Sequence, residues 1–265
     1  MEEAQAVLVE RRERILIVTI NRPDARNAVT AAVHTGLGKA LERAESDPDI
    51  RVVVLTGAGE KAFCAGTDLK ATARGESNWP DDPEQKRWGW AGFVRHPISK
   101  PIIAAVNGFA LGGGTELALA CDIVIAADHA EFGLPEVKRG IFAAAGGAFR
   151  LAQQLPQKIA MELLLTGDSF TAKRAFELGF VNHVVPLTEL MPTALAMADK
   201  IAANAPLSVQ ASKRIARGIA EGKIASEFDF WAANKREAAV VMTSADAREG
   251  PRAFAEKRAP LWKGC

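Results

Sequence analysis

The sequence predicts an α/β fold, and two patterns support that prediction. In the first half, short apolar runs alternate with stretches whose apolar residues recur three and four positions apart. From about Gly146 onward the helical pattern takes over almost throughout. A chain of 265 residues is long enough to bury a large core in one domain, or in a domain with an appendage.

Four strands are expected where apolar runs end at turn residues. They span 14–20, 51–56, 101–106 and 122–127. Because the residues in these runs are apolar without alternation, we expect strands that are covered on both faces. Residues 62–70 are expected to form the end of a further strand and the turn from it toward a helix.

Helices are expected between and after these strands. Thr30 is placed to cap a helix that continues to about Arg43. Other helical segments are expected at 113–120, 158–165, 171–178 and 188–203. Two or three more helices follow Pro206, so the predicted division is a core of residues 1–205 and a C-terminal helical region of residues 206–265.

Residues 71–98 interrupt the regular pattern. This segment is either a mobile loop or a pocket wall, and the sequence does not separate the two. Four aromatic residues in this segment are expected either to line a pocket or to pack in the core. They are Trp79, Trp88, Trp90 and Phe93.

The composition narrows the classes of function. A net charge of +1 gives no electrostatic reason to expect a nucleic-acid partner. No apolar stretch is long enough to span a bilayer, and the N-terminus lacks the features of a signal peptide, so no membrane partner is expected. Cys64, Cys121 and Cys265 are odd in number and lack CxxC spacing, which fits a cytoplasmic protein without a disulfide framework.

Several familiar motifs are absent. Gly57-Ala58-Gly59 follows a strand but lacks the third glycine of a dinucleotide-binding fingerprint. The chain has no tyrosine, no phosphate-binding GxxxxGK[ST] loop and no GxSxG nucleophile elbow. The four histidines are isolated from one another, so no metal site is predicted; they are His34, His96, His129 and His183.

Two glutamates stand beside glycine clusters. Glu116 follows Gly112-Gly113-Gly114-Thr115 at the start of an expected helix, and Glu136 follows Phe132-Gly133-Leu134-Pro135. Glycines allow close approach of a ligand to backbone N–H groups, and paired carboxylates suit acid–base chemistry on a carbonyl compound. The alternatives are that the glycines only permit close packing of helix on strand, and that Glu136 only begins a helix after a proline.

These segments together resemble the enoyl-CoA hydratase/isomerase superfamily, also called the crotonase family. The matching segments cover nearly the whole chain and are weakest at 71–98. They include Arg26-Asn27-Ala28, residues 63–70, 100–122 and 132–136, Ala145-Gly146-Gly147, Leu165-Thr166-Gly167, residues 178–181 and residues 249–258.

The resemblance implies a spiral of ββα units with a C-terminal helical region used in trimerisation, assembled as a homotrimer or as a homohexamer made of two trimers. It also implies an acyl-CoA thioester substrate and no separate cofactor, since coenzyme A is part of the substrate. By position, the backbone N–H groups of Thr67 and Gly113 would form an oxyanion hole. The residues expected to contact the substrate or CoA are Arg26, Ala28, Ala65, Asp68, Leu69, Lys70, Gly112 and Lys257.

Two of these assignments have alternatives. Arg26 approaches the CoA phosphates or forms a surface salt bridge. Lys257, together with Phe254, would complete the nucleotide site of a neighbouring subunit, although a structural role is the simpler expectation for Phe254.

The carboxylates distinguish the reactions within the family. Hydratases of the family carry glutamates at both positions that match Glu116 and Glu136, and both are present here. The implied activity is therefore reversible addition of water to a trans-2-enoyl-CoA. Glu116 is assigned as the ionised base and Glu136 as the acid, and the reverse assignment is equally compatible with the sequence.

Three other activities remain open. One is a carnitinyl-CoA dehydratase, another is a Δ3,Δ2-enoyl-CoA isomerase, and the least expected is a non-catalytic binding protein. The chain also departs from the hydratase pattern at Ala143-Ala144, where hydratases commonly have Pro-Gly and a backbone N–H that helps to place the water. At the oxyanion position, the hydroxyl of Thr67 is a possible contact to substrate.

Overall fold

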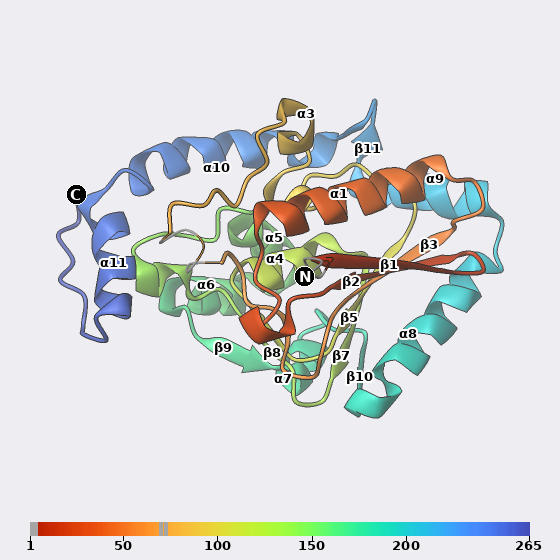
Figure 1. Ribbon diagram of the computed structural model, residues 1–265, viewed down its shortest axis with the longest axis horizontal. Helices are drawn as coiled ribbons and strands as arrows, with labels where there is room; N and C mark the ends of the chain where they lie inside the picture. Colours follow the sequence, from red (N-terminus) through yellow and green to blue (C-terminus); the bar gives the residue numbers. More distant parts are fainter. Residues whose placement is uncertain (1–4, 69–70, 72–73) are drawn as a thin grey trace.

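The structure is a computed structural model that describes residues 5–68, 71 and 74–265 (Figure 1). Its strands are β1 (Val7–Arg12), β2 (Ile15–Ile20), β3 (Val52–Gly57), β4 (Ala62–Cys64), β5 (Ile102–Val106), β6 (Phe109–Leu111), β7 (Ile123–Ala127), β8 (Glu131–Gly133), β9 (Ser169–Thr171), β10 (His183–Val185), β11 (Ile219–Ala220) and β12 (Lys223–Ile224). Its α-helices are α1 (Ala31–Ser46), α3 (Pro83–Lys86), α4 (Gly113–Ala120), α5 (Gly147–Gln154), α6 (Gln157–Thr166), α7 (Ala172–Glu177), α8 (Leu187–Ala202), α9 (Pro206–Arg217), α10 (Phe228–Val241) and α11 (Ala245–Ala255). Short 3₁₀ turns are η1 (Pro23–Ala25), η2 (Trp90–Gly92), η3 (Pro135–Arg139) and η4 (Ala225–Glu227).

The four predicted strands form the middle of a six-stranded sheet. The order in this sheet is β1-β2-β3-β5-β7-β10, with β2, β3, β5, β7 and β10 parallel and β1 antiparallel to β2 at one edge. The prediction that these strands are covered on both faces is confirmed. Alternate residues of β3 enter two different cores, with Val53 and Leu55 in one and Val52 and Val54 in the other.

Helices cover this sheet on opposite sides, as Figure 1 shows for α1 and α8. The smaller core is formed by the outer face of the sheet with Leu190, Ala194 and Ala198 of α8. The larger core lies on the other face, where α1 buries Val33, Leu37 and Leu41. Thr30 caps α1 as predicted, because its hydroxyl accepts a hydrogen bond from the Val33 N–H.

A second sheet of very short strands has the order β4-β6-β8-β9. Strands β4, β6 and β8 are parallel, and β9 is antiparallel to β8. The chain passes from β3 to β4, from β5 to β6 and from β7 to β8, so each turn adds one strand to each sheet. The predicted spiral of ββα units is therefore confirmed.

Most of this second sheet was not predicted from the sequence. Only the segment containing β4 was expected to hold a strand, because three residues are too few to show a periodic pattern. Strands β1, β9 and β10 were missed too, since Glu10, Arg11 and Arg12 interrupt the apolar run of β1 and the others are only three residues long.

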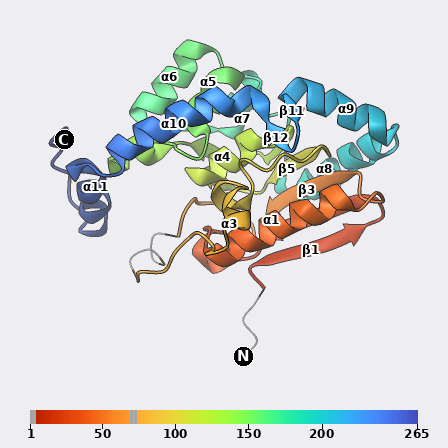
Figure 2. The same cartoon turned by 90° about the horizontal axis from the view of Figure 1, so that it is seen from above.

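The C-terminal helices α9, α10 and α11 occupy the region predicted to be helical, and Figure 2 shows them extending from the end of the sheet toward the C-terminus. In the 71–98 segment, Trp88 and Phe93 are buried and Trp79 is exposed. Core packing is therefore confirmed for Phe93, which belongs to the larger core, whereas Trp88 also lines a pocket with Arg95 and Trp231. Of the residues that the structure describes, no helix is both long and apolar enough to cross a membrane.

Candidate active site

Three consecutive parallel strands of the short sheet end at the candidate site. The segment after β4 contains Thr67, the segment after β6 contains Gly113 and Glu116, and the segment after β8 contains Glu136. Carboxyl ends of neighbouring parallel strands lie at the same edge of a sheet. Residues separated by up to seventy positions in the sequence therefore meet there.

The backbone hydrogen bonds around Thr67 determine the direction of the Thr67 N–H. Val29 donates its N–H to the Gly66 carbonyl (2.8 Å) and accepts from the Asp68 N–H (3.0 Å), which makes Thr67 its partner in a parallel bridge. In such a bridge the N–H and carbonyl of the opposite residue point away from the pairing strand. The Thr67 N–H is therefore on the side away from Val29.

Gly113 supplies the second N–H. It is the first residue of α4, so its N–H has no partner within the helix, and the positive end of the helix dipole lies at this point. A Cβ atom built on Gly66 would be 3.4 Å from the Gly113 nitrogen, which shows how closely the two segments approach. Two N–H donors from separate turns of the spiral thus lie close together, which suits an oxyanion.

Both predicted carboxylates lie beside these donors. Glu116 is buried on the first turn of α4, and its Oε1 accepts a hydrogen bond of 2.8 Å from the Gly147 N–H. Glu136 is on η3, and its Oε1 lies 3.1 Å from the position that a Cβ atom would take on Gly112. Gly112 has a φ of 57°, which a residue with a side chain rarely adopts, so both its conformation and this contact require glycine.

The surroundings make both carboxyl groups hard to ionise. Burial, followed by the charge of Glu136, raises the pKa of Glu116 to about 8, while the N–H groups of Gly147 and Ala145 act in the opposite direction. Burial raises the pKa of Glu136 to about 7. The Oε2 atom of Glu136 is buried, and it has no hydrogen-bond partner among the described residues. The pair therefore keeps a proton to a higher pH than exposed glutamates do.

The turn beside Glu116 is held from the C-terminal helices. Asn234 of α10 donates its side-chain N–H to the Ala144 carbonyl (2.9 Å). Arg150 of α5, which is 1% exposed, forms a two-pronged ion pair with Glu227 at 2.9 and 2.7 Å. The Trp231 indole N–H also donates to Glu227 (3.0 Å). The region 206–265 is thus packed directly against the segment that contacts Glu116.

Sequence reasoning pointed to Ala144 for a backbone contact in this turn. In the structure the N–H that reaches Glu116 belongs to Gly147. The sequence signal for this contact is the pair of glycines in Ala145-Gly146-Gly147, a segment that also belongs to the family match.

The other predicted binding residues divide into two groups. Ala65, Arg26 and Ala28 lie together next to Thr67, because the Ala65 N–H donates to the Arg26 carbonyl (3.1 Å) and Ala28 precedes the bridging residue Val29. Arg26 is exposed and Ala28 is buried. Lys257 lies just after α11, is exposed, and has a φ of 54°.

Asp68 has a structural partner. Its carboxylate forms an ion pair with Arg22 (2.8 Å) and accepts from the Ala71 N–H (3.0 Å), and the residue is 7% exposed. Leu69 and Lys70, which were also predicted to bind CoA, lie outside the described residues.

The hydroxyl of Thr67 contacts a residue that the sequence does not single out for this site. The indole N–H of Trp90 donates to the Thr67 Oγ1 at 3.1 Å. Trp90 was expected only as one of several aromatic residues in the irregular segment. A contact across 23 positions leaves no local pattern in the sequence.

Comparisons with known proteins agree along the whole chain. The sequence profile described as enoyl-CoA hydratase/isomerase matches residues 10–265. A carnitinyl-CoA dehydratase from Proteus mirabilis is 43% identical over 263 residues, which is 98% of this chain and 99% of that protein.

Solved structures give the same result. The crystal structure of a carnitinyl-CoA hydratase from Mycobacterium avium is 56% identical and has a TM-score of 0.96, over 99% of this chain and 100% of that one. That of an enoyl-CoA hydratase from Mycobacterium tuberculosis is 48% identical with a TM-score of 0.75, over 98% of this chain and 100% of that one.

Proposed function

The chain belongs to the enoyl-CoA hydratase/isomerase family, and from that premise we propose that it is a hydro-lyase acting on acyl-CoA thioesters. The reaction is the reversible addition of water across the 2,3 double bond of a trans-2-enoyl-CoA. The observation that carries this proposal is the meeting of two carboxyl groups of raised pKa, Glu116 and Glu136, beside two backbone N–H donors.

The thioester oxygen binds at the N–H groups of Thr67 and Gly113. When water attacks C3, negative charge moves through C2 and the carbonyl carbon onto this oxygen. Preorganised N–H donors stabilise that charge by roughly 3 kcal/mol each. The electrophilic character of C3 increases because the carbonyl is polarised in this way.

The two glutamates supply and remove protons. The ionised carboxylate accepts one proton from the attacking water, whose oxygen bonds to C3, and the protonated carboxyl group gives its proton to C2. Because the pair starts and ends with one proton, it can also run the dehydration. This acid–base step needs no separate cofactor, since coenzyme A arrives with the substrate.

The distribution of the proton bears on the assignment of roles. The expected assignment makes Glu116 the base and Glu136 the acid, and burial raises the pKa of both carboxyl groups. Because the charge of Glu136 also acts on Glu116, the two groups titrate together and the proton belongs to the pair. We therefore assign the acid and base roles to the pair, with the proton moving between the two carboxyl groups.

The test is turnover of crotonyl-CoA by wild type, E116Q and E136Q. We expect wild type to hydrate it, and each substitution to lower kcat by about 10² to 10⁴-fold because one proton-transfer group is lost. Binding of a saturated acyl-CoA, measured by calorimetry, should persist in both variants. An unchanged kcat in E136Q would remove Glu136 from the mechanism, and isomerisation of a 3-enoyl-CoA without hydration would favour the isomerase.

A second substrate is favoured by the similarity to proteins named carnitinyl-CoA dehydratase and carnitinyl-CoA hydratase. Their substrate is a 3-hydroxyacyl thioester with a trimethylammonium group on C4, and its dehydration uses the same carboxyl pair. Comparing kcat/KM for crotonyl-CoA and for its 4-trimethylammonio derivative distinguishes the two. A preference above about 100-fold, or roughly 3 kcal/mol, identifies the preferred acyl group.

The assembly is proposed to be a homotrimer or a homohexamer. Large apolar side chains on α9 and α10 are exposed in the isolated chain, which supports burial against other subunits; they are Leu207, Ile215, Phe228 and Val240. Sedimentation should give three or six times the 28.3 kDa of one chain, and a monomeric mass would contradict this proposal. We also place the protein in the cytoplasm, which the free cysteines Cys64, Cys121 and Cys265 support.

A further inference from the structure

Trp90 makes contact with both residues whose N–H groups point into the candidate site. Its indole N–H donates to the Thr67 Oγ1 at 3.1 Å. The other end of the ring system lies over Gly113, because a Cβ atom built there would be 2.1 Å from Cη2 and 2.5 Å from Cζ2 of Trp90. Any side chain at position 113 would therefore displace the indole.

The backbone that presents Trp90 is unusual and firmly held. Gly89, Ala91 and Gly92 all have positive φ angles, of 76°, 59° and 67°. For Ala91 this conformation is costly, at about 1–3 kcal/mol for such a backbone outlier. Gly92 lies against α1, where a Cβ atom would be 2.2 Å from the His34 carbonyl oxygen. The turn η2 thus fixes the indole relative to the main core.

The indole contacts two segments whose backbones already approach closely, since a Cβ atom built on Gly66 would be 3.4 Å from the Gly113 nitrogen. Thr67 and Gly113 belong to different turns of the spiral, so a side chain that contacts both residues can fix how their N–H groups are oriented relative to each other. An indole is rigid, and here one edge is held by a hydrogen bond and the other by van der Waals contact. Oxyanion stabilisation depends steeply on donor placement.

We propose that Trp90 is a positioning residue that sets the spacing and orientation of the Thr67 and Gly113 N–H groups. It acts through Thr67 and Gly113 and does not touch the reacting atoms. The inference rests on the proposed oxyanion hole and adds the side chain that aligns it. It also gives a reason for threonine at position 67, whose hydroxyl accepts the indole hydrogen bond.

The experiment compares W90F, T67V, the W90F/T67V double variant and the control W88F. W90F keeps an aromatic ring without the N–H, and T67V keeps the shape and the backbone N–H without the hydroxyl. Trp88 is the matched control because it is on the same segment, is 7% exposed, and donates its own indole N–H to Glu42 (2.9 Å), away from the site.

Two quantities are measured for each variant. The first is kcat and KM for crotonyl-CoA. The second is measured with 4-dimethylaminocinnamoyl-CoA, a thioester whose absorption reports polarisation of its carbonyl. It is the red shift of the absorption maximum of this probe on binding, expressed per molecule of probe bound. A residue that only stabilises the fold changes the melting temperature and leaves this shift unaltered.

We expect W90F and T67V each to lower kcat by about tenfold with KM changed by less than about threefold. The double variant should lose no more than W90F alone, because W90F has already removed the hydrogen bond that T67V abolishes. The red shift should fall in all three, whereas W88F keeps the full shift and a kcat within about twofold of wild type.

An undiminished red shift with normal kcat in T67V overturns the inference, even if W90F is too unstable to study. Additive losses in the double variant overturn it too, since they show that the two groups act independently. A wild type that binds the probe with a red shift but does not hydrate crotonyl-CoA contradicts the proposed function, and the effect of T67V on the shift still decides the role of Trp90.

Discussion

Glu116 and Glu136 depend on each other for their protonation. Both carboxyl groups lose hydration on burial, and the charge of Glu136 adds to the rise in the pKa of Glu116. Hydration needs one carboxyl group in each form. The proposed mechanism therefore requires that Glu116 and Glu136 together hold one proton, and the number of protons that they hold changes with pH.

We expect a bell-shaped dependence of kcat/KM on pH. Below about 7 both groups become protonated and the base is lost, and above about 8 both become ionised and the acid is lost. These limbs belong to the pair and not to either residue alone. The measurement is kcat/KM for crotonyl-CoA between pH 5 and 10, and a profile that only rises, with a midpoint near the ordinary glutamate value, would contradict the coupled pair.

The structure brings together the residues that the sequence predicts for the site, and it adds a neighbour that the sequence does not predict. Glu116, Glu136, Thr67 and Gly113 were all assigned from their place in a family pattern, and the structure brings them to one sheet edge. Trp90 was not assigned, because its contact with Thr67 links segments whose relation only the folded chain defines. No local sequence pattern indicates such a contact.

At the scale of elements, the length of a strand decided whether it could be predicted. The strands β2, β3, β5 and β7 have five or six mostly apolar residues and were found from composition alone. The strands β6, β8 and β9 have three residues each, and what fixes them is pairing with neighbours distant in the sequence. The site lies at the ends of these short strands, so its scaffold was the part least visible in the sequence.

The turn η3, which carries Glu136, is packed against α11 and the chain after it. A Cβ atom on Gly140, at the end of η3, would be 2.1 Å from the Asp246 carbonyl oxygen and 3.1 Å from Trp262. The Arg139 guanidinium lies 4.1 Å over the Phe254 ring. The end of the turn that carries Glu136 is thus packed against the last twenty residues.

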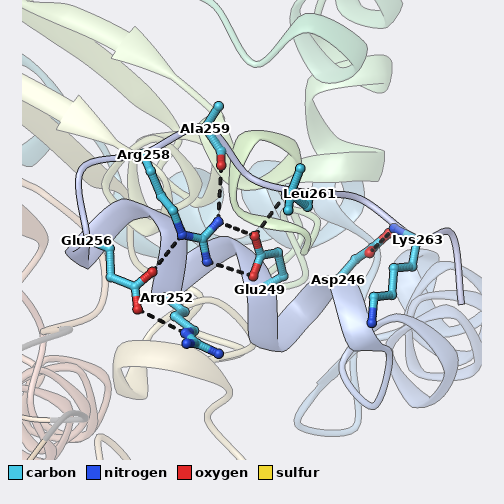
Figure 3. A network of polar contacts seen from close by, with 8 residues as sticks. All are labelled: Asp246, Glu249, Arg252, Glu256, Arg258, Ala259, Leu261 and Lys263. Atoms are coloured by element: carbon cyan, nitrogen blue, oxygen red, sulfur yellow. Dashed lines mark hydrogen bonds and ion pairs between the residues drawn. The ribbon is translucent and has the colours of Figure 1, made fainter.

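These last residues are folded back on α11 by carboxylates, as Figure 3 shows. Asp246 accepts hydrogen bonds from the backbone N–H groups of Lys263 (2.7 Å) and Gly264 (2.9 Å). Glu249 accepts hydrogen bonds from the Arg258 guanidinium (3.0 Å) and from the Leu261 N–H (2.9 Å), and these bonds lower the pKa of that carboxyl to about 2. The tail keeps Trp262 against Gly140 through these contacts.

Removing the Asp246 carboxylate should therefore affect a glutamate on another element. In D246A we expect the amides of Lys263 and Gly264 to exchange hydrogen about tenfold faster, from the loss of about 1–2 kcal/mol of hydrogen bonding. We expect kcat to fall by about threefold as Glu136 becomes less well placed. Hydrogen exchange and steady-state kinetics measure both.

The control for that variant is D229A, since Asp229 is an exposed first-turn acid on α10. It should leave both tail exchange and kcat at wild-type levels. Faster exchange in D246A with an unchanged kcat would show that the tail does not position Glu136.

At the scale of the whole molecule, a buried ion pair ties the C-terminal helices to the spiral. Arg150 and Glu227 have side chains that are 1% and 7% exposed, and Arg150 also donates to the Val94 carbonyl, four residues after Trp90. This cluster links α5, η4 and the segment that follows η2. Breaking such a pair leaves a charge buried without its partner.

We expect R150M to lower the free energy of unfolding by about 3–5 kcal/mol, because Glu227 would lose its partner inside the fold. The matched control is R252M. Arg252 forms an ion pair with Glu256 on the surface of α11, where its side chain is 72% exposed, and its loss should cost less than about 0.5 kcal/mol. Urea unfolding of the two variants provides the comparison, and equal losses would mean that burial adds nothing to the Arg150 pair.

The stacking of β4, β6 and β8 has a consequence for how such an enzyme can change over generations. In the proposed mechanism each strand is followed by a separate chemical function, with one oxyanion-hole amide after β4, the second amide and one acid–base glutamate after β6, and the other glutamate after β8. A substitution after β8 can replace the second glutamate without altering strands β4 and β6 or the residues that follow them. Proteins that share this fold can therefore acquire new reactions on CoA thioesters while they keep the same two backbone N–H donors for the thioester oxygen.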